Sequence, residues 1–323
     1  MTMVDRLGVK VSICSFTFEH ERFIAASLKS FIDQKFDKPI EIIVHDDAST
    51  DGTVQIIKNF AALDSRIHPI LRTTNLYSTG VQVFPEGFKH ARGEYIAICE
   101  GDDHWIDPYK LQRQIDVLDA DEHAVACFTD AYNVRDGVRE RYYNGIYAIE
   151  PRVKLFQKDF IAGQNIPTCT VVFRRSALGA FSRLVKNARV SDVILFTHLA
   201  NSGYFIYQPC FTGVRNMHAG GVHSLQSRAH KTAVVLHTLP FIDRASRGIF
   251  RKEILTRRRR LLLNAWSEAI NNKDAHLARL VWPMIARDRK ALGWNITTTL
   301  RNFMKAYLPK VEAIYTRIFE GNR

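Results

Sequence analysis

Apolar, β-rich runs alternate with segments of helical periodicity through the first hundred residues of the chain. Residues 9–16 predict a first strand, apolar side chains recur at helical spacing over 25–32, and residues 40–45 predict a second strand. A strand, a helix and another strand in succession favour a parallel sheet whose crossover connections are helices. The pattern therefore predicts an α/β fold of the nucleotide-binding type.

The same rhythm continues with a predicted helix at 53–63, a strand at 67–71, a helical stretch ending near Ala91 and a strand at 95–99. In open α/β sheets, ligands bind in the crevice beyond the carboxyl ends of the strands. We therefore expect the residues that follow Phe16, His45 and Cys99 to converge on one crevice.

Four residues directly behind the last of these strands, Glu100-Gly101-Asp102-Asp103, place three carboxylates close together. Such groups repel one another unless a cation lies between them. Mg²⁺ and Mn²⁺ accept carboxylate oxygens and complete their coordination with phosphate and water. The pattern favours a divalent metal site over the alternative, which is a solvated acidic turn capping the helix that begins near Tyr109.

A second acidic corner closes the second strand with Asp46 and Asp47. Ser49 and Asp51, further along, are typical N-cap residues for the following helix. Asp46 instead lies at the strand end, where a carboxylate can accept a hydrogen bond from a base edge or a ribose hydroxyl. We therefore assign Asp46 and Asp47 to a nucleotide-sugar site.

The end of the first strand contributes Phe16, Phe18 and Glu19 to the same predicted site, as an aromatic wall with a polar rim. Core packing of the two phenylalanines is the competing interpretation. Arg72, directly behind the strand at 67–71, is assigned to this nucleotide-sugar site as well.

The pattern becomes mixed after residue 109, with helices at 109–121 and 192–200 and strands at 124–128 and 168–173. We predict a catalytic domain at 1–225, with a nucleotide-sugar half at about 1–108 and an acceptor half at about 109–225. Strand signals then vanish, and the remainder, 226–323, predicts a basic helical extension.

These ordered motifs resemble those of the family 2 glycosyltransferases over residues 9–225. The resemblance rests on the corner at 46–53, on Ala91-Arg92-Gly93 leading into Glu100-Gly101-Asp102-Asp103, and on Trp105 and Lys110-Leu111-Gln112. It implies a GT-A fold, with a mixed, mostly parallel sheet flanked by helices. It also implies inverting transfer of a sugar from a UDP- or dTDP-linked donor to a saccharide or lipid-linked saccharide, in bacterial polysaccharide or lipopolysaccharide assembly.

The resemblance also assigns roles to residues. It places Mn²⁺ or Mg²⁺ on Asp102, with Asp103 beside it, and brings His218 toward the metal and diphosphate from a closing loop. Glu100 stands where the family usually has aspartate, and we group it and Asp102 with the donor-binding residues. Asp192, at a helix start, is the implied general base; the alternative is that it only stabilises that helix terminus.

The net charge of +12 is unevenly distributed. Residues 1–225 carry 25 Lys and Arg against 26 Asp and Glu, whereas 226–323 carry 20 against 7. Such a basic segment implies an anionic partner, and an anionic membrane surface is favoured over nucleic acid. The alternative is a solvated charged face on an ordinary helical cap. A polyanion-binding protein built on these helices is the alternative function from another class.

A sugar nucleotidyltransferase is the nearer enzymatic alternative, although residues 15–19 lack the glycine-rich loop expected of one. The five cysteines occur singly, mostly in apolar segments, which is typical of reduced thiols in a cytosolic protein. No apolar run is long enough to span a bilayer. We therefore expect a cytoplasmic protein that is peripheral on the membrane at most.

Overall fold

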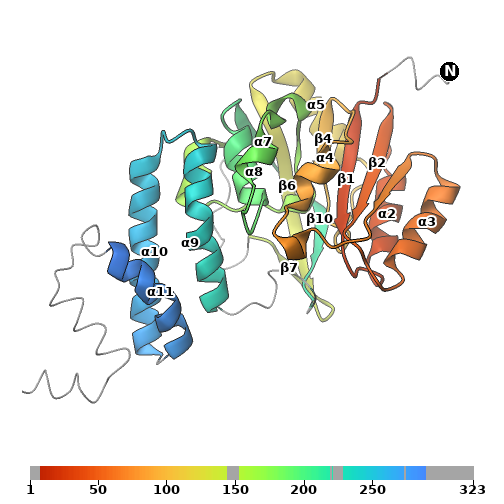
Figure 1. Ribbon diagram of the computed structural model, residues 1–323. Helices are drawn as coiled ribbons and strands as arrows, with labels where there is room; N and C mark the ends of the chain where they lie inside the picture. Colours follow the sequence, from red (N-terminus) through yellow and green to blue (C-terminus); the bar gives the residue numbers. More distant parts are fainter. Residues whose placement is uncertain (1–7, 144–152, 219, 221–227, 273, 289–323) are drawn as a thin grey trace, which may run out of the picture. The chain divides into compact units, whose positions relative to one another are not determined.

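The computed structural model describes residues 8–143, 153–218, 220, 228–272 and 274–288 (Figure 1). The chain divides into two compact units. The first comprises Met1–Leu225 with Pro240–Ile249, and the second comprises Gln226–Leu239 with Phe250–Arg323. The predicted domain boundary at residue 225 stays a prediction.

The first unit is built on one mixed sheet. Its strands are β1 (Val11–Thr17), β2 (Ile40–Asp46), β3 (Ile67–Leu71), β4 (Tyr95–Ile98), β5 (His104–Trp105), β6 (Ala124–Arg135), β7 (Val138–Arg141), β8 (Lys154–Leu155), β9 (Val172–Arg174) and β10 (Tyr204–Asn216).

Strand order in this sheet is β3-β2-β1-β4-β9-β6-β10-β5, with β7 added beside β6 and β8 beside β10. The neighbours from β3 to β4 run parallel, as do β6 and β10, whereas β9 is antiparallel to both β4 and β6. The carboxyl ends of β1, β2 and β4 consequently lie at one edge, which confirms the convergence expected there.

Helices cover both faces of the sheet (Figure 1). These helices of the first unit are α2 (Ile24–Ile32), α3 (Thr53–Leu63), α4 (Val83–Phe88), α5 (Lys110–Ala120), α6 (Gln157–Ala162), α7 (Phe181–Leu184) and α8 (Asp192–Leu199). The chain continues with α9 (Arg228–Ala245), whose residues are divided between the two units, and with α10 (Arg251–Asn271) and α11 (Ala275–Asp288) of the second unit.

Alternation along the strands separates two hydrophobic cores. Cys14 and Phe16 of β1 point into a core shared with α4, α6, α7 and α8, whereas Val11 and Ile13 point into one shared with α2, α3 and α5. This is the period of two expected of a strand buried on both faces. The α/β class predicted from the sequence is confirmed.

The acceptor half differs most from the predicted elements. β10 runs over 13 residues where no strand was predicted, and it pairs with β6, which extends well beyond the predicted 124–128. The predicted strand at 168–173 is instead a short 3₁₀ turn at Thr168–Thr170 followed by β9.

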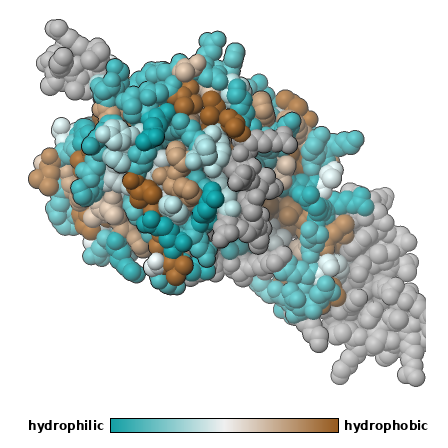
Figure 2. Space-filling view, turned by 180° about the vertical axis from the view of Figure 1, so that it is seen from behind, coloured by the Kyte–Doolittle hydropathy of each residue, from teal (hydrophilic) through white to brown (hydrophobic). Residues whose placement is uncertain are grey.

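The second unit is helical in its described residues. Helices α10 and α11 pack through Trp266 and Trp282, whose ring centroids lie 5.5 Å apart, and through an ion pair of 2.7 Å between Arg258 Nε and Asp288 Oδ2. None of the described helices combines the length and apolarity needed to cross a membrane. Figure 2, which views the molecule from behind, shows apolar residues scattered among hydrophilic ones rather than gathered in a band.

Candidate active site

Three side chains from distant parts of the chain meet at the carboxyl edge of the sheet. His218 Nε2 lies 3.0 Å and His20 Nε2 lies 3.8 Å from Asp102 Oδ2. One ligand atom from each of the three residues falls within 4.8 Å of the others. His20 follows β1, Asp102 follows β4, and His218 follows β10, so the trio is assembled by three strand ends.

The turn that carries Asp102 is held by close packing against β1 and α2. Gly101 donates its N–H to the Phe16 carbonyl oxygen at 2.8 Å, and a Cβ at this position would lie 2.7 Å from Thr17 Cβ. Only glycine fits such an approach without displacing its neighbours. The Ser27 hydroxyl of α2 lies within hydrogen-bond reach of the carbonyl oxygens of Gly101 and Asp103.

Electrostatics favour an ionised Asp102 beside neutral imidazole. Burial by itself would raise the pKa of Asp102, but the hydrogen bond from His218 and the proximity of His20 outweigh it and lower the pKa. Burial lowers the pKa of His20, because desolvation penalises the charged ring. A metal ion requires ionised carboxylate and neutral imidazole ligands, so both protonation states suit a cation.

Glu100 and Asp103 differ from Asp102 in their surroundings. Burial, and after it the charge of Asp102, raises the pKa of Glu100 to about 7, and Asp192 acts in the same direction. Burial also raises the pKa of Asp103 well above its usual value. Glu100 Oε2 is buried without a hydrogen-bond partner among the described residues. The alternative of a solvated acidic turn does not describe this cluster, because Asp103 is only 6% exposed.

The structure does not bring Asp103 into the trio. Its carboxylate accepts a 3.0 Å hydrogen bond from the backbone N–H of Asn216, while Asn216 Nδ2 donates to the Asp102 carbonyl oxygen at 2.6 Å. These bonds dock the end of β10 onto the acidic turn. The metal role given to Asp103 stays a prediction, since its present partner is the backbone.

Two residues of this region were absent from the sequence-based assignments. His20 lies directly after the first strand, a position that the strand-end rule marked, and its imidazole could have drawn attention there. Arg215 could not be found in this way, because it lies within β10, a strand that the sequence did not predict. Its positive charge partly neutralises the charges of Asp103 and Glu100, and it donates a hydrogen bond to Asn133 Oδ1 at 3.1 Å.

The carboxylates of Asp46 and Asp47 both bind backbone N–H groups of nearby loops. Asp46 accepts hydrogen bonds from the N–H of Ser49 at 2.9 Å and from its hydroxyl at 2.5 Å. Asp47 accepts from the N–H groups of Leu76 and Tyr77 at 2.7 and 3.0 Å. Both residues are buried at the end of β2 and shape the rim of the crevice, and their contact with a donor stays a prediction.

The N-cap of α3 is Gly52 rather than Asp51 or Ser49, although Asp51, one residue earlier, still accepts a 3.0 Å hydrogen bond from the Thr53 N–H at its Oδ1. Glu19 crosses to the same corner, where its Oε1 accepts from the Thr50 N–H at 2.7 Å. These bonds tie the loop after β1 to the loop after β2.

The two phenylalanines lie in different environments. Phe16 is 5% exposed, and its ring centroid lies 4.7 Å from that of Phe84, so this residue packs in the core. Phe18 is 43% exposed at the strand end and remains available to a ligand. Arg72 is exposed, and its backbone N–H donates to the Asp46 carbonyl oxygen at 3.0 Å.

Asp192 is the first residue of α8 and is half-buried. Its Oδ1 accepts a 2.7 Å hydrogen bond from the Val193 N–H, as expected for a carboxylate at a helix start. Its charge contributes to raising the pKa of Glu100, so the start of α8 lies close enough to act electrostatically on the acidic turn. The helix-terminus role and the general-base role are compatible in this position.

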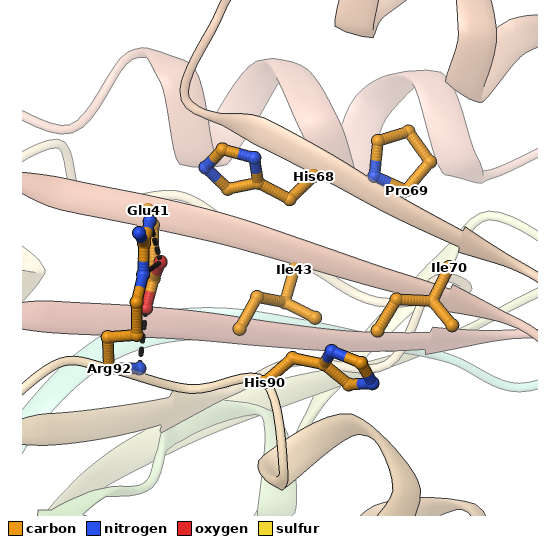
Figure 3. Close-up of a pocket in the computed structure, with 7 residues that line it drawn as sticks. All are labelled: Glu41, Ile43, His68, Pro69, Ile70, His90 and Arg92. Carbon is orange, nitrogen blue, oxygen red and sulfur yellow. Dashed lines mark hydrogen bonds and ion pairs between the residues drawn. The ribbon is translucent and has the colours of Figure 1, made fainter.

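A cavity of about 510 Å³ lies elsewhere in the first unit (Figure 3). Its floor is formed by Ile43 and Ile70, and Glu41 there is paired with Arg92 at 2.7 Å. The remaining lining residues are His68, Pro69 and His90. Its lining runs along β2 and β3 from Glu41 and His68 to Ile70, and none of the residues His20, Asp102 and His218 belongs to it.

The donor set at the carboxyl edge fits a divalent cation. It combines one ionised carboxylate with two imidazoles, each between 14% and 18% exposed, on atoms close enough to share one ion. His20 Nδ1 is buried with no hydrogen-bond partner in the described part of the chain, so no protein bond holds the ring away from such a ligand.

Comparison with known proteins bears on this arrangement. The chain matches the model of glycosyl transferase family 2 over residues 12–181. It is 33% identical over 241 residues to the uncharacterized protein Rv1520 of Mycobacterium tuberculosis, covering 71% of this chain and 67% of that one. It is 30% identical over 169 residues to WfaP of Escherichia coli, a UDP-Glc:alpha-D-GlcNAc-diphosphoundecaprenol beta-1,3-glucosyltransferase, covering 52% and 62% of the two chains.

A solved structure agrees with the fold. The mannosyltransferase PcManGT from Pyrobaculum calidifontis, determined with GDP-Man and Mn²⁺, superimposes with a TM-score of 0.56 at 18% identity, covering 97% of this chain and 88% of that one. The predicted GT-A architecture, with its helical C-terminal region, is confirmed by this likeness. The family match covers more than half of the chain and includes the acidic turn, although it ends before Asp192 and His218. The chain is therefore a member of glycosyl transferase family 2.

Proposed function

We propose that the protein transfers a sugar from a nucleoside diphosphate carrier to an acceptor hydroxyl with inversion, in a divalent-metal-dependent reaction at the carboxyl edge of the sheet. The observation that carries the proposal is the meeting of His20, Asp102 and His218 next to Glu100, whose pKa is also raised by the charge of Asp192. An ion held by Asp102 and His218 would neutralise charge on the departing diphosphate.

In the proposed reaction, Asp192 accepts the proton of the acceptor hydroxyl. The hydroxyl oxygen bonds to the anomeric carbon while the bond from that carbon to the diphosphate oxygen breaks, and the nucleoside diphosphate leaves. A single displacement of this kind inverts the anomeric configuration. Asp192 supports such a role because it is half-buried at the start of α8 and its charge acts on Glu100. The protein mainly positions the reactants and stabilises charge.

The base assignment is tested with Asp192→Asn. Loss of the base should reduce the transfer rate by roughly 10²- to 10⁴-fold, while binding of the nucleotide sugar changes little. Transfer is measured with radiolabelled donor, and donor binding by calorimetry. Asp37→Asn, on an exposed residue that forms an ion pair with Lys38, is the matched control and should keep full activity. Transfer that survives within a few-fold in Asp192→Asn would remove the base role.

The donor and acceptor classes are inferred from the relatives. Of the two predicted donors, UDP-linked and dTDP-linked, the UDP-linked one is supported by the UDP-Glc in the name of WfaP, and a lipid-linked saccharide acceptor by the diphosphoundecaprenol in the same name. Such an acceptor belongs at the cytoplasmic face of a bacterial membrane, where nucleotide sugars are available. We therefore place the reaction in bacterial surface-polysaccharide assembly at that face.

Helix α10 supports docking on an anionic bilayer. Arg251, Lys252, Thr256, Arg259 and Arg260 are exposed on it, and Leu255 among them is 57% exposed. Residues 226–323 as a whole carry 20 basic against 7 acidic side chains. This helix face combines basic side chains with an exposed leucine. Anionic lipids can contact both kinds of side chain, whereas a purely polar polyanion would contact only the basic ones, so anionic lipids are the better partner.

This docking is tested by co-sedimentation with vesicles. The protein should pellet with phosphatidylglycerol vesicles and stay in solution with phosphatidylcholine alone. Charge reversal at Arg251 and Lys252 should weaken pelleting, whereas Lys58→Glu on the exposed side of α3 should not. Equal failure with both lipids would remove the membrane role, and salt-sensitive binding of duplex DNA instead would favour the polyanion alternative.

A further inference from the structure

We infer that His20 is a third protein ligand of the metal, so that the site holds two imidazoles and one carboxylate and selects a transition-metal ion over Mg²⁺. The inference rests on the proposed metal-dependent transfer and deepens it by naming the class of ion.

Geometry places His20 among the ligands. Its Nε2 lies 3.8 Å from Asp102 Oδ2, and its ring centroid lies 5.9 Å from that of His218 in an edge-on arrangement. Both imidazoles therefore approach the same carboxylate oxygen. The three ligand atoms lie closer together than 4.8 Å, and no other group of three or more His, Cys, Asp or Glu side chains in the searched part of the chain meets this spacing.

The backbone of His20 is fixed from both directions. Its N–H donates to Thr53 Oγ1 at 2.9 Å, and its carbonyl oxygen accepts from the N–H groups of Phe23 and Ile24, each at 2.9 Å. The preceding residue, Glu19, adopts a positive φ of 56° and is tied to the loop after β2. A ring on so constrained a backbone is held at the site at little entropic cost.

The composition of this ligand set decides the preference. Mg²⁺ is a hard ion that takes oxygen ligands, whereas imidazole nitrogen suits first-row transition metals. An oxygen-rich site would need Asp103, but the Asp103 carboxylate is bonded to the Asn216 backbone. The nearby Glu100 retains a buried unpartnered oxygen, yet it does not belong to the group of three. Two nitrogens out of three protein ligands therefore tilt the site away from Mg²⁺.

The inference is tested by metal binding to the full chain without donor or acceptor. Dissociation constants for Co²⁺, Mn²⁺ and Mg²⁺ are measured by calorimetry, and the visible absorption of bound Co²⁺ reports nitrogen ligation. His20→Ala should weaken Co²⁺ binding by at least about tenfold and change the Co²⁺ spectrum, with a much smaller effect on Mg²⁺. His20→Asp should lower the ratio of Mg²⁺ to Co²⁺ dissociation constants by supplying oxygen instead.

His68→Ala is the matched control, because His68 is exposed on the edge strand β3 and lies outside the trio. It should bind Co²⁺ as the wild type does. The far-ultraviolet circular dichroism and the melting temperature of each variant without metal establish that it is folded. The inference is overturned if folded His20→Ala and His20→Asp keep the wild-type Co²⁺ affinity and spectrum, or if the wild type binds Mg²⁺ as tightly as Co²⁺.

The two proposals fail separately. Metal-stimulated sugar transfer with unchanged Co²⁺ binding in the His20 variants would leave the proposed function standing and remove His20 as a ligand. If the protein transfers no sugar but prefers Co²⁺ in a His20-dependent way, His20 remains a metal ligand and the proposed function is removed.

Discussion

At the scale of single residues, the core of the first unit contains a charged group far from water. Lys110, the first residue of α5, is fully buried. Its Nζ donates to Gln114 Oε1 at 2.6 Å and lies 4.2 Å from the centroid of the Trp105 ring. Burial lowers the pKa of Lys110 to about 8, because the ammonium group loses its hydration.

Lys110→Met should therefore change the pH dependence of stability. Between pH 8 and about 10.4, the usual lysine pKa, the unfolded wild type binds a proton that the folded form has released, so wild-type stability rises with pH relative to the variant. Near pH 7 the wild type carries the cost of a buried charge, and methionine should be neutral or stabilising. Urea unfolding of both proteins at pH 7 and pH 10 measures this. A constant difference between them would contradict the lowered pKa.

At the scale of elements, β10 links the acceptor half to the acidic turn. Its start pairs with β6 and β8, and its end supplies Arg215 and Asn216 to the acidic turn, just before His218. Gly203 precedes this strand, where a Cβ would collide with the backbone carbonyl oxygen of His123. The register of β10 thus depends on a glycine outside the site.

Gly203→Ala should destabilise the first unit by about 1–3 kcal/mol, because the added Cβ would meet the backbone of His123, which cannot move aside as a flexible side chain could. Urea unfolding gives the value. Gly8→Ala, at a position where a Cβ would have nothing within 4 Å, is the control and should leave the unfolding midpoint unchanged. A Gly203→Ala protein as stable as this control would show that β10 accommodates the added carbon.

At the scale of the whole molecule, donor and metal should stabilise the folded chain together. In the presence of Mn²⁺, the nucleotide sugar that the protein uses should add about 2.7 kcal/mol to the free energy of unfolding when its concentration is a hundredfold above its dissociation constant. A thermal-shift panel of UDP-, dTDP- and GDP-sugars measures the effect with and without a chelator. Equal stabilisation in the presence of chelator would contradict a metal-linked donor site.

The α/β class and most elements of the donor half could be predicted from the amino-acid sequence. The helix at 53–63 and the strand at 67–71 have the predicted bounds, and the edge where Asp46 and Asp102 lie was marked by strand ends alone. These features follow from local periodicity and turn residues, which act over a few neighbours along the chain.

Which of these candidate residues lie together depends on the folded structure and could not be predicted from the sequence. His20, Asp102 and His218 come from three strand ends, whereas Asp103 turns to a backbone partner and Phe16 to the core. The strand β10 was not predicted, because its sequence contains Pro209 and Gly213 and is only partly buried. It is stabilised by pairing with β6. Contacts between residues about a hundred positions apart depend on how the strands and helices pack, and local sequence patterns do not determine this packing.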